Sequence, residues 1–159
     1  MMTQRLVILI SLLLISFHTF AAPHKPTLKE EDLYVEVIKS YRLRNSLLLK
    51  KNVEQFVQAH PKSPFADNAL YLRGQLLMQN RLFTEAIQEF QKVQDRYPRS
   101  NKMVSALFSK GQAYRKLNLF DYAEKTFRSI KKDYPGSPEA ERVDLELKLV
   151  EVQRVGSVN

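Results

Sequence analysis

The chain has 159 residues, of which 25 are Lys or Arg and 17 are Asp or Glu, so its formal net charge at pH 7 is +8. It contains no cysteine, which excludes disulfide bonds, thiolate metal sites, a cysteine nucleophile and a lipidated N-terminal cysteine. With 44% hydrophobic residues but only 4 Gly and 7 Pro, the composition is that of one ordinary globular domain.

The N-terminal segment, residues 1–21, is typical of a secretory signal peptide. A short stretch ending at Arg5 precedes the apolar run 6–17. Thr19 and Ala21 are small residues at the two positions before the cleavage site that a signal peptidase recognises. Cleavage one residue later is disfavoured because it would put Phe20 at such a position. An uncleaved anchor is the alternative, but this apolar run rises only about 18 Å against a hydrocarbon core of about 30 Å. We therefore expect a periplasmic chain that starts near Ala22, with a short leader 22–29 and neither lipid anchor nor membrane span.

The basic excess indicates the kind of partner that an exported chain would meet. Without Arg5 the net charge is +7, and outside the cytoplasm it favours the anionic cell wall, membrane surfaces or acidic proteins over nucleic acid. The charge is uneven, since residues 101–137 hold eight bases and three acids whereas residues 138–159 hold three bases and five acids. An acidic partner is therefore expected to bind near residues 101–137.

A repeat of 37 residues organises the rest of the sequence. Pro61, Pro98 and Pro135 are 37 residues apart, and residues 64–100 laid over 101–137 without a gap share eleven identities. Residues 27–63 fit the same frame less well. They keep Leu33, Tyr34, Pro61 and Ser63 but have Val37, Leu49 and Val53 where the other units have Gly, Ala and Phe. This divergence is typical of a terminal repeat.

Each unit is predicted to be a pair of helices. Ser63, Ser100 and Ser137 offer N-cap oxygens, and the first helices run to about Gln79 and Lys116. Asn80 and Asn118 suit the left-handed conformation that ends a helix. Second helices follow over about 82–96 and 119–133, where apolar residues recur every three or four positions and the next Tyr-Pro stops the helix.

The two ends of the array are predicted separately. Thr27 to Glu30 form a capping box that opens a helix to about Leu43, and Ser46 caps a second helix to about Ala59. After Ser137 and Pro138, residues 138–154 form one helix that covers the last pair, followed by a flexible tail 155–159. The predicted fold is therefore an all-α domain over 30–154, with three helix pairs (about 27–63, 64–100 and 101–137) and a C-terminal capping helix.

The positions of small and aromatic residues in these units resemble the tetratricopeptide repeat. The residues that carry the resemblance are Gly74, Ala86, Phe90 and Pro98 in one unit and Gly111, Tyr114, Ala123, Phe127 and Pro135 in the next. Small residues allow two helices to approach closely, and the large ring fills the space between pairs. The period of 37 exceeds the common period of 34 by nearly one helical turn. The resemblance implies an α-α superhelix that binds other proteins.

The longer unit with Tyr-Pro-x-Ser endings is similar to the C-terminal domain of the CpoB (YbgF) family of periplasmic Tol-Pal accessory proteins, and more distantly to the BamD family of outer-membrane assembly lipoproteins. Two departures stand out. CpoB-like proteins carry an N-terminal coiled coil that trimerises them, whereas only residues 22–26 precede the first predicted helix here. BamD relatives are anchored through a lipidated cysteine, which this chain lacks. The oligomeric state and the partner contacts of those families are therefore not carried over.

Residue constellations for catalysis or metal binding are missing from the sequence. His18 and His24 precede the repeats, and His60 occupies the place of Tyr97 and Tyr134, where a packing role is expected. One structured histidine without cysteine leaves no candidate set for zinc or for a nucleophile and its base. The acidic clusters at residues 30–32 and 139–141 lie at helix starts, where the helix dipole favours negative charge. No enzyme activity, metal or cofactor is predicted.

A partner-binding groove is expected on the first helices, as the resemblance implies. The 37-residue frame superposes Tyr34, Tyr71 and Phe108, which either pack between neighbouring first helices or form a ladder that faces a ligand. The other predicted groove residues are Ile38, Arg42, Gln75, Gln79, Gln112, Arg115 and Lys116. Apolar side chains of a partner would lie against the rings and its acids near the bases, unless those bases are simply solvated.

The CpoB resemblance implies a periplasmic scaffold that holds envelope proteins together during outer-membrane constriction or cell-wall synthesis. An accessory of outer-membrane protein assembly and a direct binder of an anionic cell-wall polymer or lipopolysaccharide are the alternatives.

Overall fold

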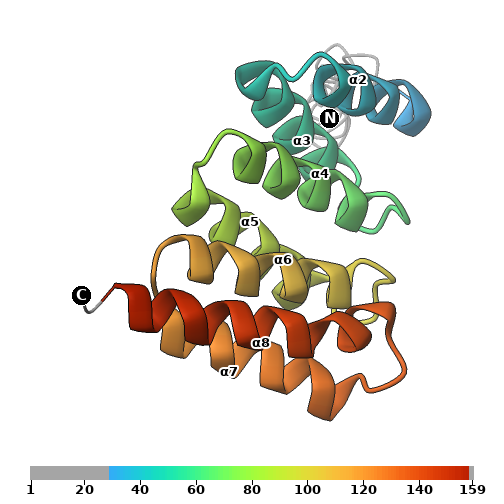
Figure 1. Cartoon of the computed structure of the whole chain (residues 1–159). Coiled ribbons are helices and arrows are strands. Elements are labelled where there is room, and N and C mark those ends of the chain that lie inside the picture. Colours follow the sequence, from blue (N-terminus) through green and yellow to red (C-terminus); the bar gives the residue numbers. More distant parts are fainter. Residues whose placement is uncertain (1–28, 158–159) are drawn as a thin grey trace, which may run out of the picture.

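The computed structural model describes residues 29–157, and this part of the chain is all α (Figure 1). Its helices are α2 (Glu30–Arg42), α3 (Ser46–Ala59), α4 (Ala66–Gln79), α5 (Phe83–Arg96), α6 (Met103–Lys116), α7 (Phe120–Asp133) and α8 (Pro138–Gly156). The prediction of an all-α array of three helix pairs and a closing helix is confirmed. The predicted signal peptide, leader residues 22–28 and residues 158–159 of the tail lie outside the described part.

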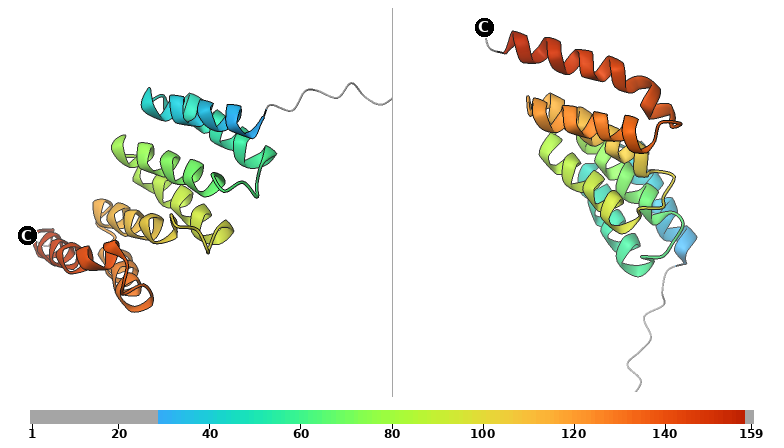
Figure 2. Two further views of the ribbon diagram at one scale, coloured as in Figure 1. Left: turned by 90° about the vertical axis from the view of Figure 1, so that its right-hand side faces the viewer. Right: turned by 90° about the horizontal axis from the view of Figure 1, so that it is seen from below.

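The helices form two layers. The first helices α2, α4 and α6 lie in one layer and the second helices α3, α5 and α7 in the other (Figure 2). Helix α8 contacts α7 and also α6, as α6 contacts α5 and α4. It therefore continues the first-helix layer, as the first helix of a further unit would, and it ends two residues beyond the predicted residue 154.

The turns inside the three pairs share one backbone conformation. Arg44, Arg81 and Asn118 have positive φ angles of 52°, 62° and 57° and lie 37 residues apart. In each turn this residue and the next donate backbone hydrogen bonds to the last turn of the first helix, the pattern of a Schellman motif. The prediction for Asn80 was wrong, because Asn80 has φ of −85° and the left-handed residue is its neighbour Arg81.

The serine caps were predicted correctly at one of three positions. Ser137 accepts a hydrogen bond from the backbone N–H of Ala140 and caps α8, with Pro138 in the first turn. The hydroxyls of Ser63 and Ser100 instead accept from the N–H groups of Phe65 and Lys102, two residues on, and the helices begin only afterwards. Both hydroxyls donate to an acid of the preceding first helix, Ser63 to Glu30 and Ser100 to Asp67. These serines therefore tie consecutive units together.

The caps predicted in the first pair also differ from the structure. The side chain of Asn45, not Ser46, accepts from the N–H of Leu48 and caps α3. Helix α2 begins at Glu30 with Lys29 in the N-cap position and without a side-chain cap. Thr27 of the predicted capping box lies outside the described residues.

Close approach of a glycine to a phenylalanine joins the two helices of the second and third pairs. A Cβ on Gly74 would lie 2.5 Å from Cε1 of Phe90, and one on Gly111 would lie 2.8 Å from Cε1 of Phe127. The first pair has Val37 and Val53 in these two places, and both are fully buried. Exchange of a Gly–Phe pair for a Val–Val pair keeps the core filled, because a larger residue on one helix meets a smaller one on the other.

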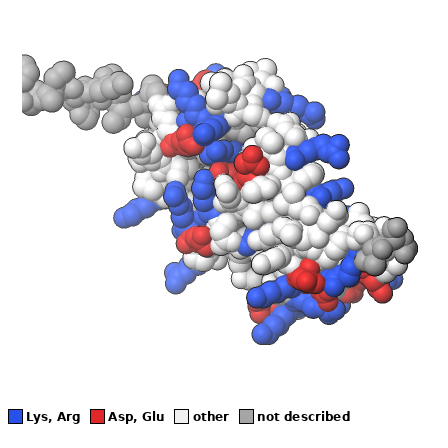
Figure 3. All heavy atoms as spheres, turned by 90° about the vertical axis from the view of Figure 1, so that its left-hand side faces the viewer, with Lys and Arg blue, Asp and Glu red and all other residues white. Residues whose placement is uncertain are grey.

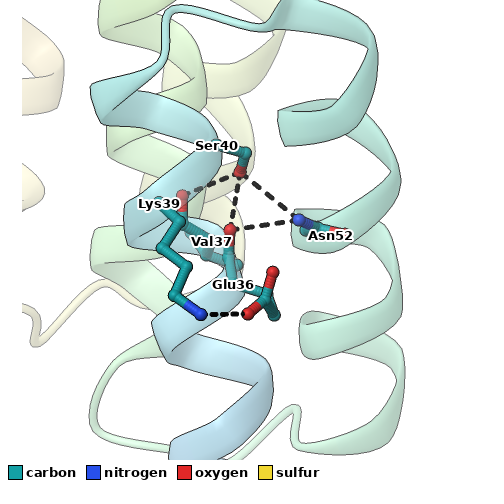
Figure 4. A network of polar contacts seen from close by, with 5 residues as sticks. All are labelled: Glu36, Val37, Lys39, Ser40 and Asn52. Carbon is teal, nitrogen blue, oxygen red and sulfur yellow. Dashed lines mark hydrogen bonds and ion pairs between the residues drawn. The ribbon is translucent and has the colours of Figure 1, made fainter.

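A buried polar network reinforces the first pair (Figure 4). The Ser40 hydroxyl donates to the backbone oxygens of Glu36 (2.8 Å) and Val37 (2.9 Å). The Asn52 amide of α3 donates to the same Glu36 oxygen (3.0 Å) and to Ser40 Oγ (3.4 Å). Polar groups removed from water need such partners, so Asn52 ties α3 to one register on α2.

Candidate protein-binding surface

The predicted groove residues lie on the first-helix layer, where each first helix faces the next. Their side chains do not all reach solvent, because hydrogen bonds recur between neighbouring first helices at separations of 34 or 38 residues. The predicted groove is therefore in large part a set of contacts within the chain.

The three superposed aromatic rings are held by other residues of the chain. Tyr34 stacks on Phe65 at 4.6 Å between ring centroids, and its Oη accepts a hydrogen bond from Asn68 of the next first helix (2.6 Å). Tyr34 is half-buried and also touches Phe56. This ring contributes to the junction between α2 and α4.

Tyr71 and Phe108 continue the same series. Tyr71 is half-buried, packs on Phe90 and lies 5.7 Å from Lys102 Nζ; burial raises the pKa of its hydroxyl. Phe108 is buried, meets the edge of Phe127 at 5.5 Å and is covered by the Arg142 guanidinium at 4.5 Å. Of the two alternatives for the ladder, core packing describes Phe108, while Tyr34 and Tyr71 keep part of their surface exposed.

Amide side chains link the first helices in the same register. Gln75 donates to Ser109 Oγ at 2.8 Å, and Gln112, 37 residues later, donates to Glu146 Oε1 at 2.6 Å. Gln79 reaches Tyr41 Oη at 3.4 Å from an exposed position. These hydrogen bonds of the amide side chains set the spacing between neighbouring first helices without any ligand.

Arg115 is not available to a partner, contrary to its predicted role at the basic end of the groove. It is buried in α6, and its Nε lies 3.1 Å from Glu146 Oε2 of α8 while Nη1 donates to Gln153 (3.0 Å). Helix α8 therefore supplies the acid that a partner was expected to bring.

The accessible part of the first-helix layer is smaller than the predicted groove and extends further along the chain. Among the predicted residues, Arg42, Gln79 and Lys116 are exposed and Ile38 is half-buried. Beyond them, Leu145 (62% exposed), Leu149 and Arg142 lie uncovered on α8.

The uncovered residues of α8 were missed by the sequence reasoning. Leu145 lies 37 residues after Phe108, and Leu149 lies 37 residues after Gln112, so both occupy positions that contact the next first helix in earlier units. Extension of the repeat frame past Ser137 would have found them. The described chain provides no further helix to cover them, so the layer ends in an apolar face.

The residues expected to be structural lie in the core or at the ends of helices. Ala86, Phe90, Ala123 and Phe127 are fully buried, Gly74 and Gly111 contact the phenylalanine rings, and Tyr114 stacks on Tyr122 at 5.4 Å. Pro98 and Pro135 follow the last residues of α5 and α7. His60 packs at the end of α3, with its Nδ1 3.9 Å from Glu30 Oε2 and its ring 5.9 Å from Phe56.

Neither a metal site nor a membrane span is visible in residues 29–157. Within this range no three His, Cys, Asp or Glu side chains gather closely enough to hold a metal ion. No helix of the described part is long and apolar enough to cross a membrane.

Comparison with known proteins agrees with this architecture. Two family models, both described as tetratricopeptide repeat, match residues 50–101 and residues 105–137. The chain is therefore a tetratricopeptide-repeat protein. No curated protein sequence matches it.

Among solved structures, the chain is similar to the TPR2B domain of yeast Sti1 in its complex with pHsp70. The match has a TM-score of 0.61 and 18% identity, and covers 79% of this chain and 98% of that domain. At this identity the likeness shows the fold alone. Tetratricopeptide-repeat domains in general mediate contacts between proteins, which is the coarse function of this chain.

Proposed function

We propose that this chain is a periplasmic scaffold that binds a segment of an envelope protein on its first-helix layer. Three features support the proposal: the repeat architecture, the predicted signal peptide and the similarity of the Tyr-Pro-x-Ser units to the CpoB family. The role that follows is coordination of outer-membrane constriction or cell-wall synthesis alongside the Tol-Pal system.

One observation carries the binding proposal, namely the open apolar face of α8. In the preceding unit, the positions of Leu145 and Leu149 are held by Phe108 and Gln112, and both of those contact α8. On α8 itself these positions are exposed. A terminal unit of such an array usually presents a polar outer face for solubility, so uncovered leucines here favour a docking function.

The occupant that fits is an amphipathic helix of a partner protein. It would lie where the next first helix of the array would lie, with apolar side chains on Leu145 and Leu149. Arg142 is an exposed base on α8 itself, so acids on the rim of the partner helix would meet complementary charge. Apolar anchors with a charged rim are the usual composition of a binding hot spot.

Photo-crosslinking identifies the partner directly. The chain starting at Ala22 carries a photoreactive phenylalanine analogue at Leu149, is incubated with envelope extract and is irradiated. We expect crosslinks to Tol-Pal or cell-wall synthase components from Leu149. The control is the same analogue at Lys125, an exposed position of α7 on the second-helix layer, from which we expect none. Crosslinks only to barrel-assembly proteins would overturn the Tol-Pal role in favour of the outer-membrane assembly role.

Sedimentation with purified cell-wall sacculi tests the remaining alternative. Retention on sacculi that falls as salt rises would indicate an electrostatic contact with the polymer itself. Retention without any protein crosslink from Leu149 would replace the proposed function by direct wall binding.

A further inference from the structure

The turns inside the three helix pairs meet at one edge of the molecule, and this edge is distinct from the first-helix face. The turns 43–45, 80–82 and 117–119 lie on the left-hand side in Figure 1. We define the turn edge by one base and one leucine at each turn: Arg44 and Leu43, Arg81 and Leu82, and Leu119 with Lys116, the last residue of α6.

Leucines of the turn edge keep much of their surface exposed to solvent. Leu43 is 72% exposed, Leu82 is 42% exposed and Leu119 is 41% exposed. Leu47, at the start of α3, is still more exposed and lies beside an open apolar recess of about 370 Å³. The recess is lined by five leucines and four polar or charged residues: Leu47, Leu49, Leu76, Leu77, Leu82, Ser46, Lys50, Arg73 and Glu85. Apolar side chains therefore accompany the turns of successive units.

Basic side chains surround these leucines. Arg44, Arg81 and Lys116 are exposed, and no ion pair is recorded for them within residues 29–157. Seen from this side, Lys and Arg lie on both flanks of a largely uncharged strip, with several Asp and Glu side chains among them (Figure 3). Two exposed acids lie near these turns: Asp121, whose Oδ1 is 3.0 Å from Arg154 Nη1, and Glu85, which lines the recess beside Leu82.

Backbone groups of the turns are satisfied within the chain. The N–H groups of Arg44, Arg81 and Asn118 donate to carbonyls three residues earlier, at 2.9, 3.1 and 3.0 Å. The residue after each of them donates to a carbonyl five residues earlier. Such turns enter a poorly hydrated environment without leaving these polar groups unpaired.

We propose that the turn edge binds the surface of an anionic lipid membrane. The bases approach the headgroups while the projecting leucines enter the boundary between headgroups and acyl chains, as the two faces of an interfacial helix do. A membrane suits the edge better than a peptide because the leucines stand on separate turns of a rigid array, spread over three units. The proposal does not depend on the proposed function, which rests on Leu145 and Leu149 of α8 and not on the turns.

Vesicle binding tests the electrostatic half of the proposal. The chain starting at Ala22 is used because residues 1–21 are apolar enough to bind lipid by themselves. With vesicles of phosphatidylglycerol and phosphatidylethanolamine we expect binding that weakens with salt, and with phosphatidylcholine vesicles none. Replacement of Arg44, Arg81 and Lys116 by Gln should lower the partition coefficient about a hundredfold, which is about fivefold for each base near an anionic surface.

A charge-matched control separates the edge from overall basicity. Lys51, Lys125 and Lys132 are exposed bases of the second helices, and their triple replacement by Gln removes the same net charge. The control should retain most of the binding. An equal loss in both triple variants, or equal binding to neutral vesicles, would overturn the proposal.

A tryptophan probe tests insertion of the leucines, since the chain contains no tryptophan of its own. Leu43→Trp and Leu82→Trp should shift their fluorescence to the blue on anionic vesicles, whereas Leu145→Trp on α8 should not. If Leu43→Trp stays unshifted, or if photo-crosslinks from Leu43 in envelope extract reach a protein while vesicle binding is absent, the edge is a protein contact and the membrane assignment fails.

Discussion

Arg115 of α6 and Glu146 of α8 form a buried ion pair in which Nε lies 3.1 Å from Oε2 and both side chains are less than a tenth exposed. The pair joins the last helix pair to the closing helix. The ion pair also occupies Arg115, a base that the sequence predicted to contact a partner protein. Two predictions about α8 follow from this contact.

Replacement of Glu146 by Ala should lower the free energy of unfolding by about 3–5 kcal/mol, because it leaves Arg115 charged and buried without its acid. Urea unfolding followed by circular dichroism measures this change. The Arg115→Met, Glu146→Leu double variant should recover much of the loss, since an apolar pair of similar volume avoids the cost of desolvating two charges. A loss below about 1 kcal/mol for Glu146→Ala would show that α8 does not depend on the pair.

The glycine–phenylalanine contact predicts coupling between α6 and α7. Gly111→Val should destabilise the fold by about 1–3 kcal/mol because its side chain would overlap the Phe127 ring. Gly111→Val combined with Phe127→Val copies the Val37–Val53 arrangement of the first pair. The double variant should cost at least about 1 kcal/mol less than the sum of the two single variants. Strict additivity would mean that the two sites relax independently.

Backbone conformation in the second turn predicts a stabilising substitution. Arg81 has φ of 62°, which disfavours most side chains, whereas the equivalent residue of the third unit is Asn118. Arg81→Asn should therefore raise the free energy of unfolding by about 0.5–1 kcal/mol. Arg96→Asn, at the end of α5, serves as a control that removes the same charge from an ordinary helical position and should bring no gain.

Burial of Tyr71 predicts a loss of stability at alkaline pH. Burial raises the pKa of its hydroxyl above the ordinary value of 10.0, so the stabilisation is complete below pH 10 and is lost as pH rises through the folded-state pKa. Burial lowers the pKa of Lys110 and acts in the opposite direction near pH 10.5. Tyr71→Phe should flatten the fall in thermal midpoint above pH 10, and an unchanged profile in this variant would show that Tyr71 does not drive it.

The repeat frame was sufficient to predict the fold. Proline and glycine positions recur every 37 residues, and the first helices end at Gln79 and Lys116 as expected. The second turn was mispredicted because Asn80 was chosen by residue preference, although the frame aligns Asn118 with Arg81. The preference of asparagine for the left-handed conformation is weaker than the constraint that the two flanking helices place on the turn.

The candidate site was harder to predict because exposure depends on neighbours that are distant in the sequence. Helical spacing places Tyr34, Phe108 and Arg115 on the first-helix layer, but only the position of α8 shows that Arg115 and Phe108 are covered. The same applies to Leu145 and Leu149, which a repeat frame extended past Ser137 would have aligned with covered positions. The binding role of these residues stays a prediction.

A retention measurement on the α8 face tests the binding function most directly. The chain starting at Ala22 is immobilised as wild type, as the Leu145→Gln, Leu149→Gln double variant, and as Val35→Gln, which changes an exposed apolar residue at the opposite end of the array. Envelope proteins eluted from each are quantified after helicity has been checked. We predict that wild type and Val35→Gln retain the same partner and that the double variant retains at least about tenfold less of it. Equal retention by all three chains would contradict a binding site on α8.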